Sequence, residues 1–177
     1  RGALTSLAWW YFNRGQYAKP GLSERQAPFI AQLGMWWYYF KWQWLRDPRH
    51  VNGGLQGALA AVFLSLGLLG AWVHFRRDKS SFAFFGPLML TLTLVLIYYL
   101  NFKYGNTQPG PEGLADEARE VRDRDYFFLW RFSAWSVWAA LGLVYLWESV
   151  AALLGTDDEK IGTETVAIPR RNNWLIA

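Results

Sequence analysis

The sequence predicts an all-α membrane protein with about three transmembrane helices, preceded by an aromatic-rich interfacial helix. Two observations support this fold class. Apolar residues, which make up 53% of the 177-residue chain, are gathered in long runs, and the charged residues, at 18%, lie between those runs. A soluble helical bundle shows apolar stripes with a period of 3.6 residues rather than continuous runs. Aromatic residues make up 19% of the chain, and this content excludes a disordered protein.

Residues 1–25 form an N-terminal segment with a short apolar patch at residues 4–12. The chain begins with Arg1 rather than Met, so we expect it to be processed or truncated. The patch is compatible with the stump of another membrane helix and equally with a surface helix.

Residues 26–50 are predicted to form an amphipathic helix that lies along the membrane interface. The uncharged part, residues 27–40, has only 14 residues and is too short to cross a bilayer comfortably. Four apolar residues repeat at spacings of four, three and four and therefore share one helical face: Leu33, Trp37, Phe40 and Trp44. A tilted or re-entrant span is the alternative.

Three apolar runs follow, each about as long as a membrane span requires. Residues 55–75 and 82–102 contain no Asp, Glu, Lys or Arg, and residues 132–154 are interrupted only by Glu148. Pro87 falls in the first turns of the second run, where a proline costs a helix least. We therefore predict three transmembrane helices.

The transmembrane region, residues 51–155, contains two connections of different length. Residues 76–81 are predicted to form a tight basic turn, and residues 103–131 a long charged loop. Within that loop, residues 116–125 are interpreted as a short helix, or a helix start, beside the membrane. Basic residues lie on both sides of the predicted spans, so they leave the orientation open.

Residues 156–177 form a polar C-terminal tail with a short strand expected at residues 163–168. The basic residues are scattered around membrane turns and mixed with acids. This distribution favours anionic lipid head groups as partners and argues against nucleic acid. We expect the lipid bilayer and other membrane protein subunits to be the partners.

Two charged residues in or beside the third run are candidates for buried or paired charges, Glu148 and Arg131. A carboxylate within an apolar run is costly, and such a group is usually functional or partnered. The alternative for Glu148 is an interfacial position, one turn from the point where the helix leaves the membrane.

A juxtamembrane cluster of acids and arginines precedes the third run, and it comprises Arg119, Glu120, Arg122, Asp123, Arg124 and Asp125. Acid–arginine pairs at spacings of three and four residues stabilise a helix. Arginine forks also bind phosphate. Because acids outnumber arginines from residue 112 to residue 125, internal pairing is favoured over anion binding.

His74 is the candidate cofactor-binding residue, since a neutral imidazole at the end of the first span can ligate a haem or chlorin metal. The alternative is an interfacial histidine that hydrogen-bonds head groups or a loop. The chain has no cysteine, and His50 is the only other histidine. We therefore expect no catalytic residue, no metal and no cofactor, whereas contacts with bound lipid or pigment suit the aromatic surface.

Small residues four apart allow membrane helices to approach closely. Three such pairs lie in the predicted spans: Gly57 and Ala61, Gly67 and Ala71, and Ser136 and Ala140.

Three stretches together resemble a known family: RQAPFIAQLGMWWYYFKWQWLRD at residues 25–47, YYLNFKYGNTQP at 98–109 and REVRDRDYFFLWRFSAWSVWAALGL at 119–143. In this order they are similar to the later part of the membrane domain of the DUF2723 family, bacterial multi-pass proteins related to protein O-mannosyltransferases. The VRDRDYFF segment is the most specific part of the resemblance.

The resemblance implies a GT-C-type membrane fold that uses lipid-linked sugar donors, in the bacterial inner membrane. The family's catalytic carboxylates lie in its first large extramembrane loop, which this sequence does not contain, so no catalytic residue is carried over. We expect a non-catalytic accessory subunit of a larger membrane complex, for example a photosynthetic or respiratory one. The alternative is a C-terminal membrane fragment of a glycosyltransferase.

Overall fold

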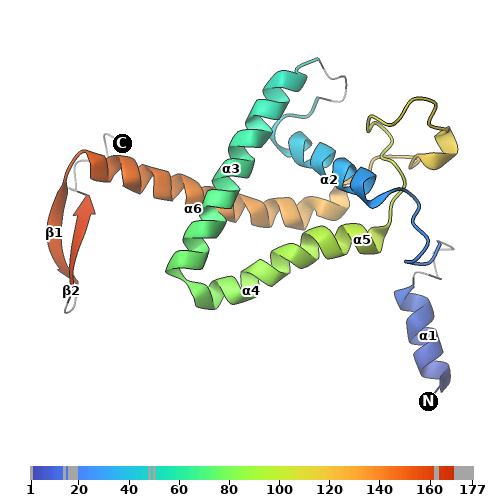
Figure 1. Cartoon of the computed structure of the whole chain (residues 1–177), viewed down its shortest axis with the longest axis horizontal. Helices are drawn as coiled ribbons and strands as arrows, with labels where there is room; N and C mark the ends of the chain where they lie inside the picture. Colours follow the sequence, from blue (N-terminus) through green and yellow to red (C-terminus); the bar gives the residue numbers. More distant parts are fainter. Residues whose placement is uncertain are drawn as a thin grey trace. The chain divides into compact units, whose positions relative to one another are not determined.

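The computed structural model describes residues 2–13, 15, 20–47, 49, 51–161 and 164–169, and these are mostly helical (Figure 1). The chain divides into two compact units, each built from two stretches of chain. Unit 1 comprises Arg1–Leu59 and Gly86–Phe132, and unit 2 comprises Ala60–Phe85 and Ser133–Ala177. The described elements, in chain order, are α1 (Gly2–Phe12), α2 (Phe29–Trp44), α3 (Gly53–Arg77), α4 (Lys79–Leu90), η2 (Thr91–Val95), α5 (Leu96–Leu100), η3 (Asp116–Ala118), η4 (Asp125–Phe128), α6 (Leu129–Leu153), β1 (Thr156–Ile161) and β2 (Glu164–Pro169).

Among the described residues, three helical segments are long and apolar enough to cross a membrane: Gly53–Arg77, Lys79–Leu100 and Asp125–Leu153. The prediction of three spans is confirmed at this level of length and composition. Only 17–22% of the residues in their most apolar windows are buried within the protein. The remaining apolar surface suits contact with lipid or with other membrane helices.

The connection between the first two spans is shorter than the sequence predicts. Asp78 is its only non-helical residue, because its Oδ1 accepts hydrogen bonds from the backbone N–H groups of Ser80 and Ser81, both at 3.1 Å. This is the geometry of a helix N-cap, and it starts α4 at Lys79. Pro87 is therefore the ninth residue of α4, and its predicted place in the first turns of the span is wrong.

The second span is irregular beyond Pro87, which removes a backbone donor inside the helix. The hydroxyl groups of Thr91 and Thr93 donate to the carbonyl groups four residues earlier, at 2.9 and 2.6 Å. The turn at Thr91–Val95 widens into a π-helix. Such back-bonding and π-turns are established causes of helix irregularity.

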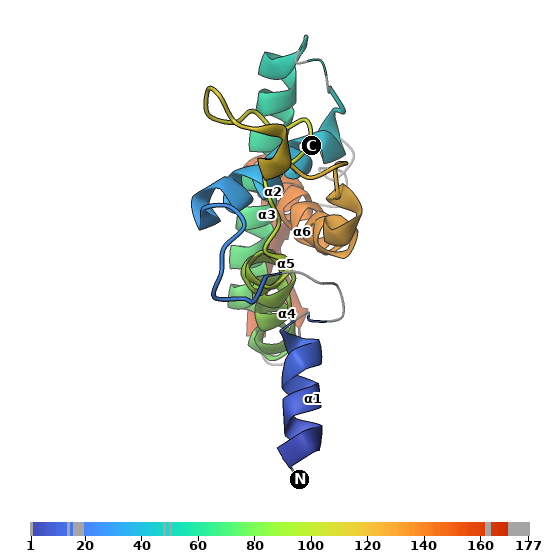
Figure 2. The same cartoon turned by 90° about the vertical axis from the view of Figure 1, so that its right-hand side faces the viewer.

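In unit 1 the core lies between α2, α5 and η4, and it is largely aromatic. Its fully buried side chains include Met35, Tyr39, Phe40, Ile97 and Phe128. Figure 2 shows that α1, with its exposed apolar side chains, extends away from the other helices of this unit. The helix α2 falls within the predicted 26–50 segment.

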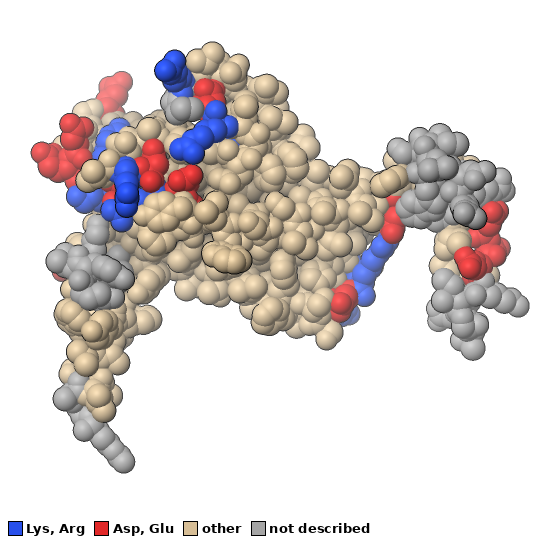
Figure 3. All heavy atoms as spheres, turned by 180° about the vertical axis from the view of Figure 1, so that it is seen from behind, with Lys and Arg blue, Asp and Glu red and all other residues tan. Residues whose placement is uncertain are grey.

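The charged loop of unit 1 is less helical than expected. Only Asp116–Ala118 forms a 3-10 turn, and the next helical turn begins at Asp125. A continuous helix over residues 116–125 therefore does not form, although a 3-10 helix starts at each end of this stretch. The chain instead extends at Arg119, which forms an isolated parallel bridge with Tyr104. On the face drawn in Figure 3, charged side chains gather over this loop, whereas the helical spans are mainly uncharged.

In unit 2, α3 and α6 cross where both helices carry glycine (Figure 1). A Cβ atom on Gly70 would lie 1.7 Å from the Trp138 carbonyl oxygen, and one on Gly142 would lie 2.1 Å from the Leu66 carbonyl oxygen. Glycine therefore permits a backbone approach that any other residue would block. A Cβ atom on Gly57 would meet nothing within 4 Å, so the predicted Gly57–Ala61 pair is not at this crossing.

The all-α prediction needs a correction because the described part of unit 2 contains a two-stranded antiparallel sheet. The strands β1 and β2 pair in register from Thr156 with Pro169 to Ile161 with Glu164. Gly155, with a φ of 127°, supplies the left-handed conformation between α6 and β1. The expected strand at residues 163–168 corresponds to β2, and β1 was not predicted.

Candidate functional site

The described polar groups gather in two places, one in each unit. In unit 1 the centre is Asn101, which ends α5 in the left-handed conformation, with a φ of 45°. Its side-chain oxygen accepts from the Gln26 backbone N–H and from Gln32 Nε2, both at 3.1 Å, and its Nδ2 donates to the Glu24 carbonyl at 2.9 Å. Asn101 is fully buried. One amide thus holds the start of α2 against the end of the second span.

Gln32 extends this network from α2. Its Nε2 also donates to the Phe102 carbonyl at 2.6 Å, and its Oε1 accepts from Arg25. The Arg25 guanidinium donates to the Tyr98 carbonyl at 2.8 Å and lies 4.6 Å from the centre of the Tyr98 ring. Burial lowers the pKa of Arg25. Each buried amide has partners, which is the condition for a stabilising polar core.

The acids of the juxtamembrane cluster also bond within the chain. Glu120 forms an ion pair with Arg124 at 3.0 Å and accepts from the Lys103 backbone N–H at 3.1 Å. Asp123 accepts from the hydroxyl groups of Tyr39 and Thr107, at 3.0 and 2.9 Å. These contacts are internal pairing, although most of the partners are distant in sequence and do not lie on one helix.

The other members of the cluster have different positions. Arg119 donates to backbone carbonyl groups of the loop, including those of Gly105 at 3.2 Å and Gln108 at 2.7 Å. Arg122 is exposed and Asp125 is half-buried at the start of η4. The described arrangement therefore uses Arg119 and Arg124 to close the loop.

Tyr39 connects α2 to this cluster. Burial raises the pKa of the Tyr39 hydroxyl, and the nearby carboxylates of Asp123 and Asp125 raise it further. The hydroxyl group donates to Asp123 and accepts from the Arg124 backbone N–H at 3.2 Å. Tyr39 is a neutral structural link rather than an acid or base.

Arg131, a predicted buried or paired charge, is buried in unit 1, with 5% of its surface exposed. Its Nε donates to the Thr93 hydroxyl, its Nη1 lies 3.9 Å from the Met89 sulfur, and its guanidinium lies 5.6 Å from the centre of the Trp36 ring. The side chain thus joins the start of α6 to the π-turn and to α2.

In unit 2, His74 is the centre of a chain of four hydrogen-bonded side chains. The indole N–H of Trp138 donates to His74 Nδ1 at 3.1 Å. Because indole is only a donor, Nδ1 is the acceptor and the ring proton lies on Nε2. That Nε2 donates to Ser81 Oγ at 2.6 Å, and Ser81 donates to Asp78 Oδ2 at 2.6 Å.

This order of donors limits the chemistry of His74. Both ring nitrogens have hydrogen-bond partners in the described arrangement, so binding of a haem or chlorin metal by His74 would require one of these bonds to break. Ser81 Oγ accepts a hydrogen bond from His74 and donates its own hydrogen to Asp78, so in this arrangement His74 is not placed as the general base of Ser81. The ring also packs against Phe82 and Phe85, with centroid distances of 5.4 and 5.8 Å. The contacts fit the alternative of a histidine that hydrogen-bonds the adjoining turn.

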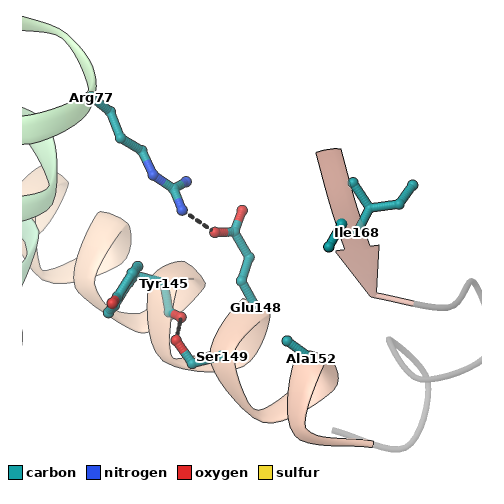
Figure 4. Close-up of a pocket in the computed structure, with 7 residues that line it drawn as sticks. Arg77, Tyr145, Glu148, Ser149, Ala152 and Ile168 are labelled. Carbon is teal, nitrogen blue, oxygen red and sulfur yellow. Dashed lines mark hydrogen bonds and ion pairs between the residues drawn. The ribbon is translucent and has the colours of Figure 1, made fainter. Parts of the chain in front are cut away.

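Glu148 pairs with Arg77 across two helices of unit 2, at 2.6 Å (Figure 4). Since Arg77 is the last residue of α3, the pair lies at the end of that span and not at its middle. Both alternatives for Glu148 are thus combined, because it is partnered and also near a helix end. Beside the pair is an open pocket, also lined by Tyr145 of α6 and Ile168 of β2.

Among the described residues, no group of three or more His, Asp or Glu side chains is placed to hold a metal ion. His50 lies outside the described residues. Sequence reasoning missed Asn101, Gln32 and Gln108, which are buried. The available signal was the presence of amide side chains inside or beside strongly apolar, aromatic segments, where a polar group needs a partner.

Comparisons with known proteins do not assign this chain to a family. No family model matches it, and neither a curated protein nor a solved structure does so. The resemblance to the DUF2723 family stays a prediction. Function is therefore argued from the contacts of the chain itself.

Proposed function

We propose that this protein is a non-catalytic, integral-membrane accessory subunit that packs within a larger membrane complex. One observation carries the proposal: side chains that enzymes use for catalysis are engaged here in bonds within the chain. His74 has both ring nitrogens bonded, Glu148 is paired with Arg77, and Asp123 accepts from two hydroxyl groups. Such contacts stabilise a helical scaffold.

The surface of the spans supports the same proposal. Large apolar side chains are exposed along all three helices, for example Leu68 of α3, Leu94 of the second span and Leu143 of α6, at 58%, 45% and 57%. Lipid covers such surfaces, and so do neighbouring transmembrane helices. Exposed Trp130, at 80%, adds an aromatic group that is typical of interfaces.

Photo-crosslinking in native membranes tests the proposal. A photo-reactive amino acid at position 68, 94 or 143 is expected to give discrete adducts with other membrane polypeptides. The matched control places it at Gln56, which is buried and donates to the Leu45 carbonyl at 2.7 Å. The proposal fails if positions 68, 94 and 143 form adducts only with lipid.

A fragment of a GT-C-type glycosyltransferase is the second candidate. The observation that favours it is that parts of all three segments of the DUF2723 resemblance meet in unit 1. Gln32 and Tyr39 of the first segment contact Asn101 of the second and Asp123 of the third. Finding the chain within a longer polypeptide that transfers sugar from a lipid-linked donor would favour this candidate over the accessory subunit.

A further inference from the structure

The pocket beside the Arg77–Glu148 pair has the character of a ligand site in unit 2 (Figure 4). Its volume is about 480 Å³, and it is open to the surface. It is lined by charged, polar and apolar residues together: Arg77, Tyr145, Glu148, Ser149, Ala152, Ala167 and Ile168. Ligand sites commonly combine apolar walls with a few convergent polar groups.

The pocket lies where lipid head groups are expected. Arg77 ends the span Gly53–Arg77 and is followed by Asp78 and Lys79. About one helical turn before Arg77 and Glu148, the rings of Trp72 and Tyr145 meet edge to face, with their centres 5.9 Å apart. Tryptophan and tyrosine concentrate at the membrane–water interface, where head groups lie.

The charged pair has capacity beyond its internal bond. In the structure, one N–H group of Arg77, on Nη2, contacts Glu148 Oε2. A guanidinium carries five N–H groups, and a carboxylate has a second oxygen. The side chains are 58% and 30% exposed, so both charges are accessible from the pocket.

We propose that this pocket binds the head group of a phospholipid that carries a primary ammonium group. The lipid phosphate accepts hydrogen bonds from Arg77, and the ammonium group donates to Glu148. Charge-assisted bonds of this kind are short and strong. Because Arg77 and Glu148 are of opposite charge, they match a zwitterionic head group better than an anionic one. An anionic head group has no positive charge to pair with the Glu148 carboxylate, which would repel its phosphate.

The same contacts discriminate between zwitterionic lipids. A quaternary ammonium group has no N–H to donate to Glu148, whereas a primary ammonium group has three. Tyr145, the aromatic residue of the pocket, already has the Arg77 guanidinium 5.7 Å from its ring centre. We therefore infer a preference for phosphatidylethanolamine over phosphatidylcholine. This inference holds whether or not the chain is an accessory subunit.

The test measures lipid retention by the full chain. The protein is reconstituted in phosphatidylcholine nanodiscs that contain equal small fractions of phosphatidylethanolamine and phosphatidylglycerol, and the lipids that remain bound on release are counted by native mass spectrometry. We expect one retained phosphatidylethanolamine, enriched about tenfold over either other lipid, as a pair of charge-assisted bonds supports. Equal retention of all three lipids would overturn the proposal.

Three variants, each with a matched control, separate binding from folding. Arg77→Gln and Glu148→Gln are expected to reduce phosphatidylethanolamine retention about tenfold, whereas Lys79→Gln and Glu159→Gln, outside the pocket lining, leave it unchanged. Ala152→Trp fills the pocket and keeps both charges; it is expected to lose the lipid without losing helical structure.

Ala140→Trp, on an exposed site of α6 away from the pocket lining, is the steric control and is expected to retain the lipid. Circular dichroism identifies any variant that fails to fold. Undiminished retention by folded Ala152→Trp would overturn the proposal even if the charge variants do not fold.

Discussion

The two units hold their helices together by different means. In unit 1, buried amides and charges join α2 to loops about 70–85 residues away in sequence, as the contacts of Gln32 and Tyr39 show. In unit 2, α3 and α6 approach through Gly70 and Gly142 with almost no space between their backbones. The core of unit 1 therefore depends on hydrogen-bond partners, whereas the α3–α6 crossing of unit 2 depends on the absence of side chains at two glycines. We therefore expect unit 1 to be destabilised when a polar side chain is removed, and the crossing in unit 2 to be destabilised when a side chain is added.

The largest expected effect is at the glycine crossing. Gly70→Ala places a Cβ atom against the Trp138 carbonyl, so the helices must move apart, and we expect a loss of about 3 kcal/mol, at the upper end for overpacking. Thermal unfolding in detergent micelles measures the loss. Gly57→Ala is the control, since its Cβ meets open space and the substitution favours the helix. Equal stability of the two variants would contradict a close crossing.

Asn101→Ala tests the network of unit 1. The substitution removes the acceptor for the Gln26 backbone N–H and for Gln32 Nε2, and we expect a loss of about 2 kcal/mol because buried donors lose their partner. Hydrogen exchange should increase at the start of α2 and not at the α3–α6 crossing. Asn106 is exposed in the loop that follows, and the control variant Asn106→Ala should change neither the stability nor the hydrogen exchange. Increased exchange throughout both units would refute separate modes of stabilisation.

The residues in these first two predictions also show which features of the fold could be predicted from the sequence. Long uncharged runs are a local signal, and they placed the ends of the first two spans to within three residues and the start of the third to within seven. The roles of Asn101 and Gly142 depend on contacts with segments 69–77 residues away, so no local pattern contains them. Only the second strand of the hairpin was predicted, because β2 contains the β-branched residues Thr165, Val166 and Ile168, whereas β1 is rich in acids.

For the candidate sites too, local sequence signals marked the residues but not their distant partners. Glu148 stood out because a carboxylate in an apolar run needs a partner, but its partner Arg77 lies 71 residues earlier. The role of His74 was open for a similar reason, because its partner Trp138 lies 64 residues later in the sequence, on α6.

Tyr39→Phe gives an intermediate effect with a characteristic pH dependence. Loss of the bonds to Asp123 and Arg124 should cost about 1–2 kcal/mol at neutral pH. The folded-state pKa of Tyr39 is raised above its usual 10.0, so its contribution is present below pH 10 and is lost as the pH rises further. Unfolding measured from pH 8 to 11 should show the wild type converging on the variant.

The control for this experiment is Tyr126→Phe, because Tyr126 is exposed. Its stability should remain parallel to that of the wild type at every pH. A constant difference between wild type and Tyr39→Phe up to pH 11 would show that Tyr39 is not held in its neutral form.

The smallest expected effect concerns the turn between α3 and α4. Hydrogen bonds from the Ser81 side chain and backbone hold the pKa of Asp78 below its usual 3.8. Its contribution to stability is therefore present above pH 3.8 and is lost as the pH falls through the folded-state pKa. Ser81→Ala should raise the pKa of Asp78 toward 3.8, as read by carboxyl NMR. If the pKa of Asp78 is unchanged in the variant, Ser81 does not donate a hydrogen bond to Asp78 and does not link it to His74.

The central claim, that this chain is an accessory subunit of a membrane complex, is tested most directly by intact-mass spectrometry of the native preparation. The protein is extracted gently from its own membranes, and both the assembly and its dissociated chains are weighed. We predict a chain that is released from an assembly in which it is present with other membrane subunits at fixed stoichiometry. A chain that exists only as part of one long, continuous polypeptide with transferase activity would contradict the account.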